Sequence, residues 1–68
     1  MVKFAIYNVV LQKFYGGTIK EGTRWLSERN AYDYGYSVLE NAKSVINSEK
    51  LNFCIPIPIF DKPKETEN

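Results

Sequence analysis

The sequence predicts one small α+β domain, in which an antiparallel sheet of three to four strands carries one helix on one face. Three observations lead to this fold class. Side chains alternate between two faces at the start of the chain and again before residue 60, and apolar residues near position 40 recur at helical spacing. The expected order of elements is β-β-β-α-β, within a single compact domain over residues 1–60.

The first strand is expected from Val2 to Tyr7, where the alternation is strict. The two faces carry Val2, Phe4 and Ile6 on one side and Lys3, Ala5 and Tyr7 on the other. The run Val9–Leu11 is apolar without alternation, so it either extends this strand through a bulge or forms the next connection.

A second strand is expected over Gln12–Tyr15 and a third over Thr23–Leu26. Gly16 and Gly17 are expected to end the second strand in a tight turn, because paired glycines readily adopt a positive φ. The residues that follow the third strand, 27–30, form a polar loop in this interpretation. Residues 31–36 are either a short strand or irregular.

The helix is expected from about Val38 to about Lys50. Ser37 and Glu40 fit a capping box, with Ser37 at the N-cap. The apolar stripe of this helix consists of Val38, Leu39, Ala42, Val45 and Ile46.

The last strand is expected over Leu51–Phe60, with one apolar face that covers the helix. That face consists of Phe53, Ile55, Ile57 and Ile59. Pro56 and Pro58 lack their N–H groups on the same side of the strand, which predicts a strand at the sheet edge. Residues 61–68 are almost entirely polar and are expected to be a disordered tail.

Composition narrows the function classes. The chain has 68 residues, 44% of them hydrophobic, and a net charge of +1, which speaks against global disorder and against binding mainly to phosphates. The start of the chain reads as a strand and not as a signal peptide. No apolar run approaches the ~20 residues that cross a bilayer. We therefore expect a cytoplasmic protein without a membrane partner.

Nothing in the sequence predicts an enzyme, a metal site or a cofactor. There is no histidine, and the single cysteine, Cys54, can form neither a Cys–His pair nor a zinc site. Cys54 is either a small half-buried apolar residue or a surface thiol. Gly16 and Gly17 lack the spacing of a phosphate-binding loop.

Aromatic and basic residues are the most suggestive set. If the helix covers the face of Phe4 and Ile6, the other face is open, and we expect it to carry Lys3, Tyr7, Lys13 and Tyr15. The best candidates for partner binding are Arg24, Trp25, Tyr32 and Tyr34, since Trp, Tyr and Arg are enriched at binding hot spots. The alternative is that Trp25 and some of the tyrosines belong to the core.

The order of these features resembles a pattern found in small phage-encoded accessory proteins. The resemblance covers about residues 3–46 and includes Lys3–Ile6, Lys13–Tyr15, Trp25, Ala31, Tyr34, the Ser37-capped helix and Ala42. It implies a protein that modulates a host protein, as phage inhibitors and anti-defence proteins do. It carries over no functional residue and does not include the Ile-Pro-Ile-Pro segment.

Three functional hypotheses follow. The first is a protein-binding module, in the form of a phage-encoded inhibitor of a host or defence protein complex. The second is a domain that binds single-stranded nucleic acid through the Lys3, Tyr7, Lys13 and Tyr15 face. The third is a self-associating structural subunit, such as a homodimer.

Overall fold

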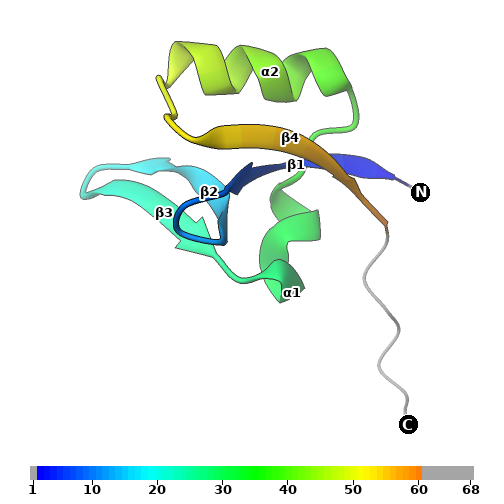
Figure 1. Ribbon diagram of the computed structural model, residues 1–68, viewed down its shortest axis with the longest axis horizontal. Helices are drawn as coiled ribbons and strands as arrows, with labels where there is room; N and C mark the ends of the chain where they lie inside the picture. The colour runs from blue at the N-terminus through cyan, green and yellow to red at the C-terminus, as the bar shows by residue number, and fades with distance from the viewer. Residues whose placement is uncertain (1, 61–68) are drawn as a thin grey trace, which may run out of the picture.

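The computed structural model describes residues 2–60. Four antiparallel strands form one sheet in the order β3-β2-β1-β4 (Figure 1). The elements along the chain are β1 Lys3–Asn8, β2 Lys13–Ile19, β3 Gly22–Leu26, α1 Glu28–Ala31, the 3₁₀ turn η1 Tyr32–Tyr34, α2 Leu39–Ser48 and β4 Cys54–Ile59. The α+β fold class is confirmed. The expected tail, 61–68, lies outside the described residues.

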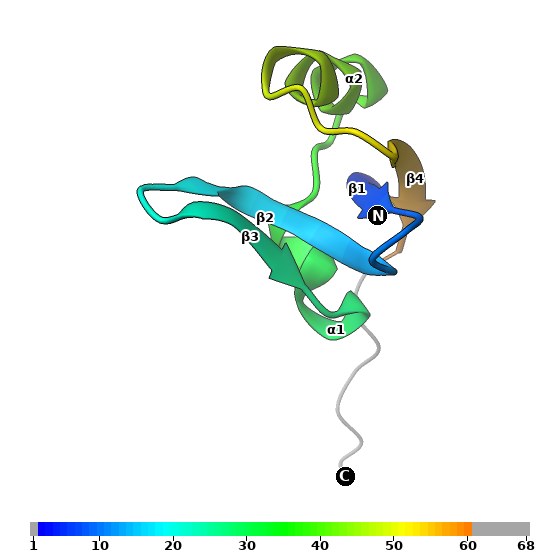
Figure 2. The same ribbon diagram turned by 60° about the vertical axis from the view of Figure 1, so that its left-hand side comes forward.

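The sheet is covered on both faces, which the sequence interpretation did not anticipate. Helix α2 lies over one face, and α1 with η1 lies under the other (Figure 2). On the α2 face, Ile6, Tyr15 and Ala42 form the buried cluster. On the α1 face, the buried cluster consists of Ala5, Phe14 and Ala31. So small a chain therefore divides its core between the two sides of one sheet.

The prediction of a polar loop over 27–30 is wrong for most of that segment, because α1 begins at Glu28. Only Ala31 of this short helix is buried, and it packs against Ala5 and Phe14. The ambiguous segment that follows is the turn η1 and then a single bridge between Tyr36 and Phe4. The Phe4 N–H donates to the Tyr36 carbonyl at 2.7 Å, and the Tyr36 N–H donates back at 2.9 Å.

Gly16 and Gly17 do not end the second strand. Strand β2 continues to Ile19, and its pairing with β3 shifts between Tyr15 and Thr18, which is a β-bulge. A Cβ on Gly16 would lie 2.7 Å from the Leu26 side chain, so the space beside Gly16 is already occupied. Gly17 has a φ of 102°, a conformation that glycine adopts without strain.

Helix α2 begins one residue later than the capping box requires. Its N-cap is Val38, which is extended and makes no side-chain capping bond, and the Val38 carbonyl accepts from the N–H of Asn41. Ser37 therefore precedes the N-cap, and the prediction that Ser37 caps the helix is wrong. Along the predicted stripe, Ala42, Val45 and Ile46 pack on the sheet, whereas Val38 is exposed.

Strand β4 begins at Cys54, three residues later than expected, because Phe53 has a left-handed backbone with a φ of 64°. Ile57 and Ile59 pack on the α1 face, and Cys54 packs on the α2 face. The prediction that the isoleucine face of the last strand covers the predicted helix, α2, is therefore wrong, because this face lies on the side of α1. The position of β4 at the sheet edge is confirmed.

Candidate protein-binding surface

The turn between β1 and β2 is organised by Asn8, whose side chain is buried. Its Oδ1 accepts hydrogen bonds from the N–H groups of Val10 at 2.9 Å and Leu11 at 2.8 Å. Its carbonyl accepts from the Gln12 N–H at 2.7 Å. Asparagine is well suited to this role, because its short amide reaches backbone donors two and three residues ahead. Asn8 therefore satisfies three successive N–H groups of the turn, while the apolar side chains of the turn remain exposed.

The chain that leads into β4 lies directly beside this turn. The Val9 N–H donates to the Phe53 carbonyl at 2.9 Å, and Asn8 lies opposite Cys54 in the β1–β4 register. Phe53 thus extends the row of exposed apolar residues from the turn towards Ile55.

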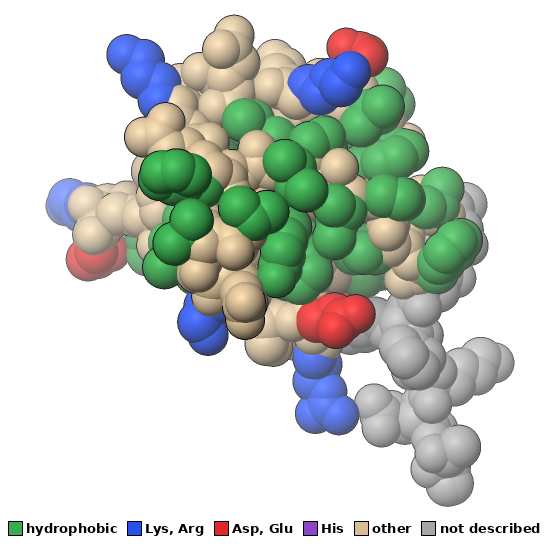
Figure 3. All heavy atoms as spheres, in the orientation of Figure 1, with side chains coloured by type: hydrophobic (Ala, Val, Ile, Leu, Met, Phe, Trp, Pro, Cys, Tyr) green, Lys and Arg blue, Asp and Glu red, His purple; other side chains and the backbone are tan. Residues whose placement is uncertain are grey.

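Five apolar side chains form this exposed row. Their exposed fractions are 67% for Phe53, 62% for Val10, 48% for Leu11, 47% for Val9 and 46% for Ile55. We call these five residues the apolar surface. Hydrophobic side chains gather across the face of the molecule that carries β4 and the β1–β2 turn (Figure 3). Large exposed apolar patches are typical of interaction sites, whereas single exposed apolar residues are ordinary.

Cys54 adjoins the apolar surface but is not an activated thiol. It is half-buried, and burial raises its pKa above the ordinary value, against the opposing effect of a hydrogen bond with the Asn8 side chain. A reactive cysteine needs a lowered pKa. Of the two alternatives for Cys54, the half-buried apolar residue agrees with the structure.

The four residues predicted to bind a partner do not form one site. Arg24 and Tyr34 do meet: Arg24 Nη1 donates to Tyr34 Oη at 3.2 Å, and the guanidinium carbon lies 5.9 Å from the ring centroid. Tyr32 instead receives the Lys3 ammonium, at 4.7 Å from its own ring centroid. Trp25 packs on the other side of the sheet.

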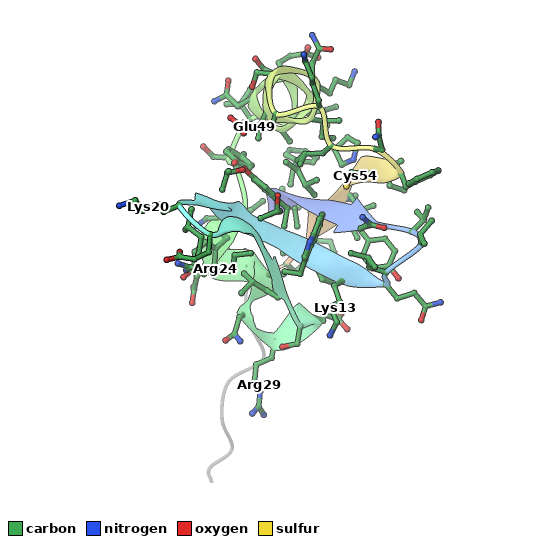
Figure 4. All side chains as sticks on the ribbon, turned by 90° about the vertical axis from the view of Figure 1, so that its left-hand side faces the viewer. Lys13, Lys20, Arg24, Arg29, Glu49 and Cys54 are labelled. Carbon is green, nitrogen blue, oxygen red and sulfur yellow. The ribbon has the colours of Figure 1, made fainter. Side chains whose placement is uncertain are left out.

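Trp25 belongs to the cluster under α2. Its ring packs edge-on against Tyr15, with 6.1 Å between centroids. Adjacent residues of a strand point to opposite faces, so Arg24 lies on the side of α1 (Figure 4). The core alternative therefore describes Trp25 better than the exposed anchor that we predicted.

The predicted sheet face also divides. Tyr7 packs against Phe14 on the α1 face, with 4.9 Å between ring centroids, while Tyr15 is buried on the α2 face. Lys3 shares the face of Tyr7, and Lys13 shares that of Tyr15. The prediction that all four lie on one open face is wrong, because Tyr7 pairs with Phe14 in the β1–β2 register and both faces carry a helix.

A small polar network ties β2 to the end of α2. Thr18 Oγ1 donates to Glu49 Oε1 at 3.1 Å, and its separation from Tyr15 Oη is 2.8 Å. Since the single Thr18 proton goes to Glu49, Tyr15 donates to Thr18. Burial raises the pKa of the neighbouring Tyr36, and the charges of Tyr15 and Glu49 raise it further. The network connects the sheet to the end of α2.

Within residues 2–60, no group of three or more His, Cys, Asp or Glu side chains could hold a metal ion. In the same range, no helix is long and apolar enough to cross a membrane. Comparisons with protein-family models, with curated proteins and with solved structures find no match for this chain.

The apolar surface was not identified from the sequence. The available signal was the run Val9–Leu11, which is apolar yet does not alternate and stands between two strand patterns. An apolar run in a short connection has no second layer to pack against, and it remains exposed.

Proposed function

We propose that the chain is a small non-enzymatic protein-binding module that docks through the apolar surface. The observation that carries this proposal is that three exposed apolar side chains of a turn fixed by Asn8 lie beside two more, Phe53 and Ile55, at the start of the neighbouring β4 segment. A turn whose N–H groups are already held by Asn8 and Phe53 loses little conformational freedom on binding, so apolar burial there contributes efficiently to affinity.

The composition of the apolar surface favours a protein partner over nucleic acid. None of its five residues is charged, and single-stranded nucleic acid binds where cationic and aromatic side chains alternate along a groove. The Lys3, Tyr7, Lys13 and Tyr15 set, on which the nucleic-acid hypothesis rested, is divided between two faces of the sheet.

The identity of the partner extends the proposal further. The resemblance to phage-encoded accessory proteins makes the partner a host or defence protein, and the site of action the cytoplasm of the host cell. In that case the module acts by occupying a surface of its target, since a few anchor residues can carry most of the binding energy of an interface.

The test is affinity capture from bacterial lysate with the immobilised chain and two variants. Val10→Asp places a charge in the apolar surface, and Ile19→Asp places the same charge on an exposed apolar residue at the end of β2. We expect the parent and Ile19→Asp to capture one stoichiometric partner and Val10→Asp to lose it, with affinity reduced about 30-fold or more, as for a hot-spot residue.

Circular dichroism first establishes that all three proteins are folded. Equal capture by folded Val10→Asp and the parent would overturn the docking surface. Absence of any stoichiometric partner, together with sedimentation of a stable dimer that Val10→Asp dissociates, would replace the proposal with self-association.

A further inference from the structure

The two edges of the sheet present different backbone groups to solvent. Phe4 uses both its N–H and its carbonyl to bond Tyr36, and β4 pairs with the other side of β1. The N–H and carbonyl groups of successive residues alternate in direction along a strand. Those of Phe4, Ile6 and Asn8 therefore point towards the β2 side of β1, and those of the residues between them point towards β4.

The same alternation extends to β3. Asn8 lies opposite Lys13, so the backbone N–H and carbonyl of Lys13 point back to β1, and those of Phe14 point to β3. Leu26 lies opposite Phe14, so its backbone N–H and carbonyl point inward to β2, as do those of Arg24 two residues earlier. The N–H and carbonyl groups of Thr23 and Trp25 consequently face away from the sheet.

No strand pairs with this outer side of β3 in the part of the chain that the structure describes. On β4, the corresponding outward positions include Pro56 and Pro58, which have no N–H to donate. The β3 edge thus offers donors and acceptors in alternation, whereas the β4 edge offers mainly acceptors. Only the β3 edge can receive a further strand with a full ladder.

The side chains beside the β3 edge differ between its two faces. Arg24 is exposed on the α1 face, where one guanidinium N–H donates to Tyr34. A guanidinium has five N–H donors, so several remain for a carboxylate. On the α2 face, half-buried Trp25 offers an apolar flank. Lys20 lies at the tip of the β2–β3 hairpin and Arg29 on α1, beyond the two ends of β3 (Figure 4). Each has an acidic neighbour in sequence, Glu21 and Glu28, so Arg24 is the cation on which charge complementarity rests.

We propose that the β3 edge is a second binding site, which accepts an extended peptide segment by strand addition and reads an acidic side chain through Arg24. Main-chain bonds to Thr23 and Trp25 supply the pairing, and the alternating side chains of the added strand supply the specificity. An acidic residue on the α1 face of the segment meets the Arg24–Tyr34 pair, and apolar neighbours meet Trp25. This site is separate from the apolar surface, and either can fail without the other.

A second copy of the chain is the weaker occupant for this edge. An antiparallel pair of β3 strands centred on Arg24 places two guanidinium groups opposite each other, and like charges in that position are destabilising. Charge complementarity instead selects an acidic segment.

The experiment is an NMR titration of the ¹⁵N-labelled chain with the capped peptide Thr-Val-Glu-Val-Thr and its Gln analogue. We expect the amide signals of Thr23 and Trp25 to shift, and the Gln peptide to bind about 5- to 10-fold more weakly, because a charge-assisted bond is lost. Arg24→Gln should weaken binding of the Glu peptide by the same factor and abolish the preference for Glu over Gln. Lys20→Gln is the matched control and should retain that preference.

A synthetic chain with N-methylated Thr23 removes one outward donor and should bind at least about 10-fold more weakly, as loss of a main-chain bond predicts. Because Arg24 is exposed and Arg24→Gln leaves every backbone group in place, we expect this variant to fold, and its ¹⁵N spectrum checks that before the affinities are compared. Peptide-induced shifts at β4 instead of β3, or an unchanged Glu preference in Arg24→Gln, would overturn the proposal. Concentration-dependent shifts at β3 without peptide would assign the edge to a second copy. Capture of the lysate partner by Arg24→Gln, unchanged from the parent, would show that the apolar surface acts independently.

Discussion

The two edge strands, β3 and β4, differ in which groups they expose at the edge of the sheet. Strand β4 carries two prolines; the exposed apolar residue Phe53 directly precedes it, and Ile55 lies at its start. Strand β3 contains no proline, and its backbone remains available at Thr23 and Trp25. In the two binding sites that we propose, side chains provide the contact surface on one side of the molecule, and backbone groups provide it on the other.

The difference between the two edges reflects how readily each would pair with another chain and aggregate. An apolar edge with a complete set of donors is a template for aggregation, and proline removes those donors where β4 is most apolar. Strand β3 is short and carries the charge of Arg24, and its partner strand is distorted by the bulge at Gly16 and Gly17. Charge, brevity and a bulge limit uncontrolled pairing while leaving the hydrogen-bonding groups in place.

The largest expected effect is on stability, and it compares how much a residue of β3 and a residue of β4 each contribute to the core. Trp25→Ala should lower the free energy of unfolding by about 3 kcal/mol, since an aromatic ring packed on Tyr15 is removed. Ile55→Ala should cost less than about 1 kcal/mol, because Ile55 is exposed on β4. Urea denaturation measures both, and equal losses would show that the edges share the core equally.

The next effect concerns the bulge that shapes the β3 edge. Gly16→Ala should destabilise the fold by about 1–3 kcal/mol, because the added Cβ overlaps the Leu26 side chain. In a Leu26→Ala background, the same substitution should cost much less, since the overlapping atoms are gone. A double-mutant cycle with no coupling would mean that Gly16 is needed for its backbone conformation alone.

The pH dependence of stability tests the environment of Tyr36, which forms a bridge to Phe4 of β1. The pKa of Tyr36 is raised above its ordinary value of 10.0, so the folded state favours the neutral hydroxyl. This contribution is complete below pH 10.0 and is lost as the pH rises through the folded-state value. Unfolding midpoints should therefore fall less for Tyr36→Phe than for the parent as the pH rises above 10.0, the ordinary tyrosine value. Parallel decreases would show that Tyr36 ionises as it does in the unfolded chain.

The edge position of β4 could be predicted because proline acts locally: a missing N–H excludes Pro56 and Pro58 from a central strand in any context. The alternation in β1 and the apolar stripe of α2 are also local signals. Helix α1 could not be predicted, since only Ala31 is buried and its burial depends on Phe14, far away in sequence. Gly16 and Gly17 suit a turn and a bulge equally well, and only the register of β2 against β3 distinguishes the two.

The candidate site was harder to predict because it depends on register and on what lies across each face. The turn over residues 9–12 sets Tyr7 opposite Phe14, which places Tyr7 and Tyr15 on opposite faces. Helix α1 then covers the face that was expected to be open. The apolar surface arises because no described element lies over Val9–Leu11, a fact that no local pattern contains.

Restoring donors to the β4 edge would change association more than stability. The double variant Pro56→Thr and Pro58→Thr gives β4 outward N–H groups beside the apolar surface, and we expect concentration-dependent self-association in sedimentation velocity. The free energy of unfolding of the monomer should change by less than about 1 kcal/mol, because the inward ladder with β1 is unaffected. The matched variant Thr23→Ser, which leaves the β3 backbone as it is, should remain at the parental oligomeric state. A monomeric double variant would mean that proline is not what keeps the β4 edge unpaired.

The smallest expected effect lies in the connection to α2, outside both edge strands. Ser37→Ala should change the free energy of unfolding by less than about 0.5 kcal/mol, which is below the usual ~1 kcal/mol cost of losing an N-cap. The reason is geometric: the N-cap is Val38, its carbonyl accepts the bond from Asn41, and the Ser37 side chain makes no capping bond. Val38→Ser, which places a hydroxyl at the actual N-cap, should instead stabilise the helix, because serine there can accept a bond from an otherwise unpaired N–H. Thermal denaturation of the two variants distinguishes the assignments, since a loss near 1 kcal/mol for Ser37→Ala would place the start of α2 at the capping box after all. Because neither substitution touches a backbone group of β3 or β4, both variants should bind the acidic peptide and the lysate partner as the parent does.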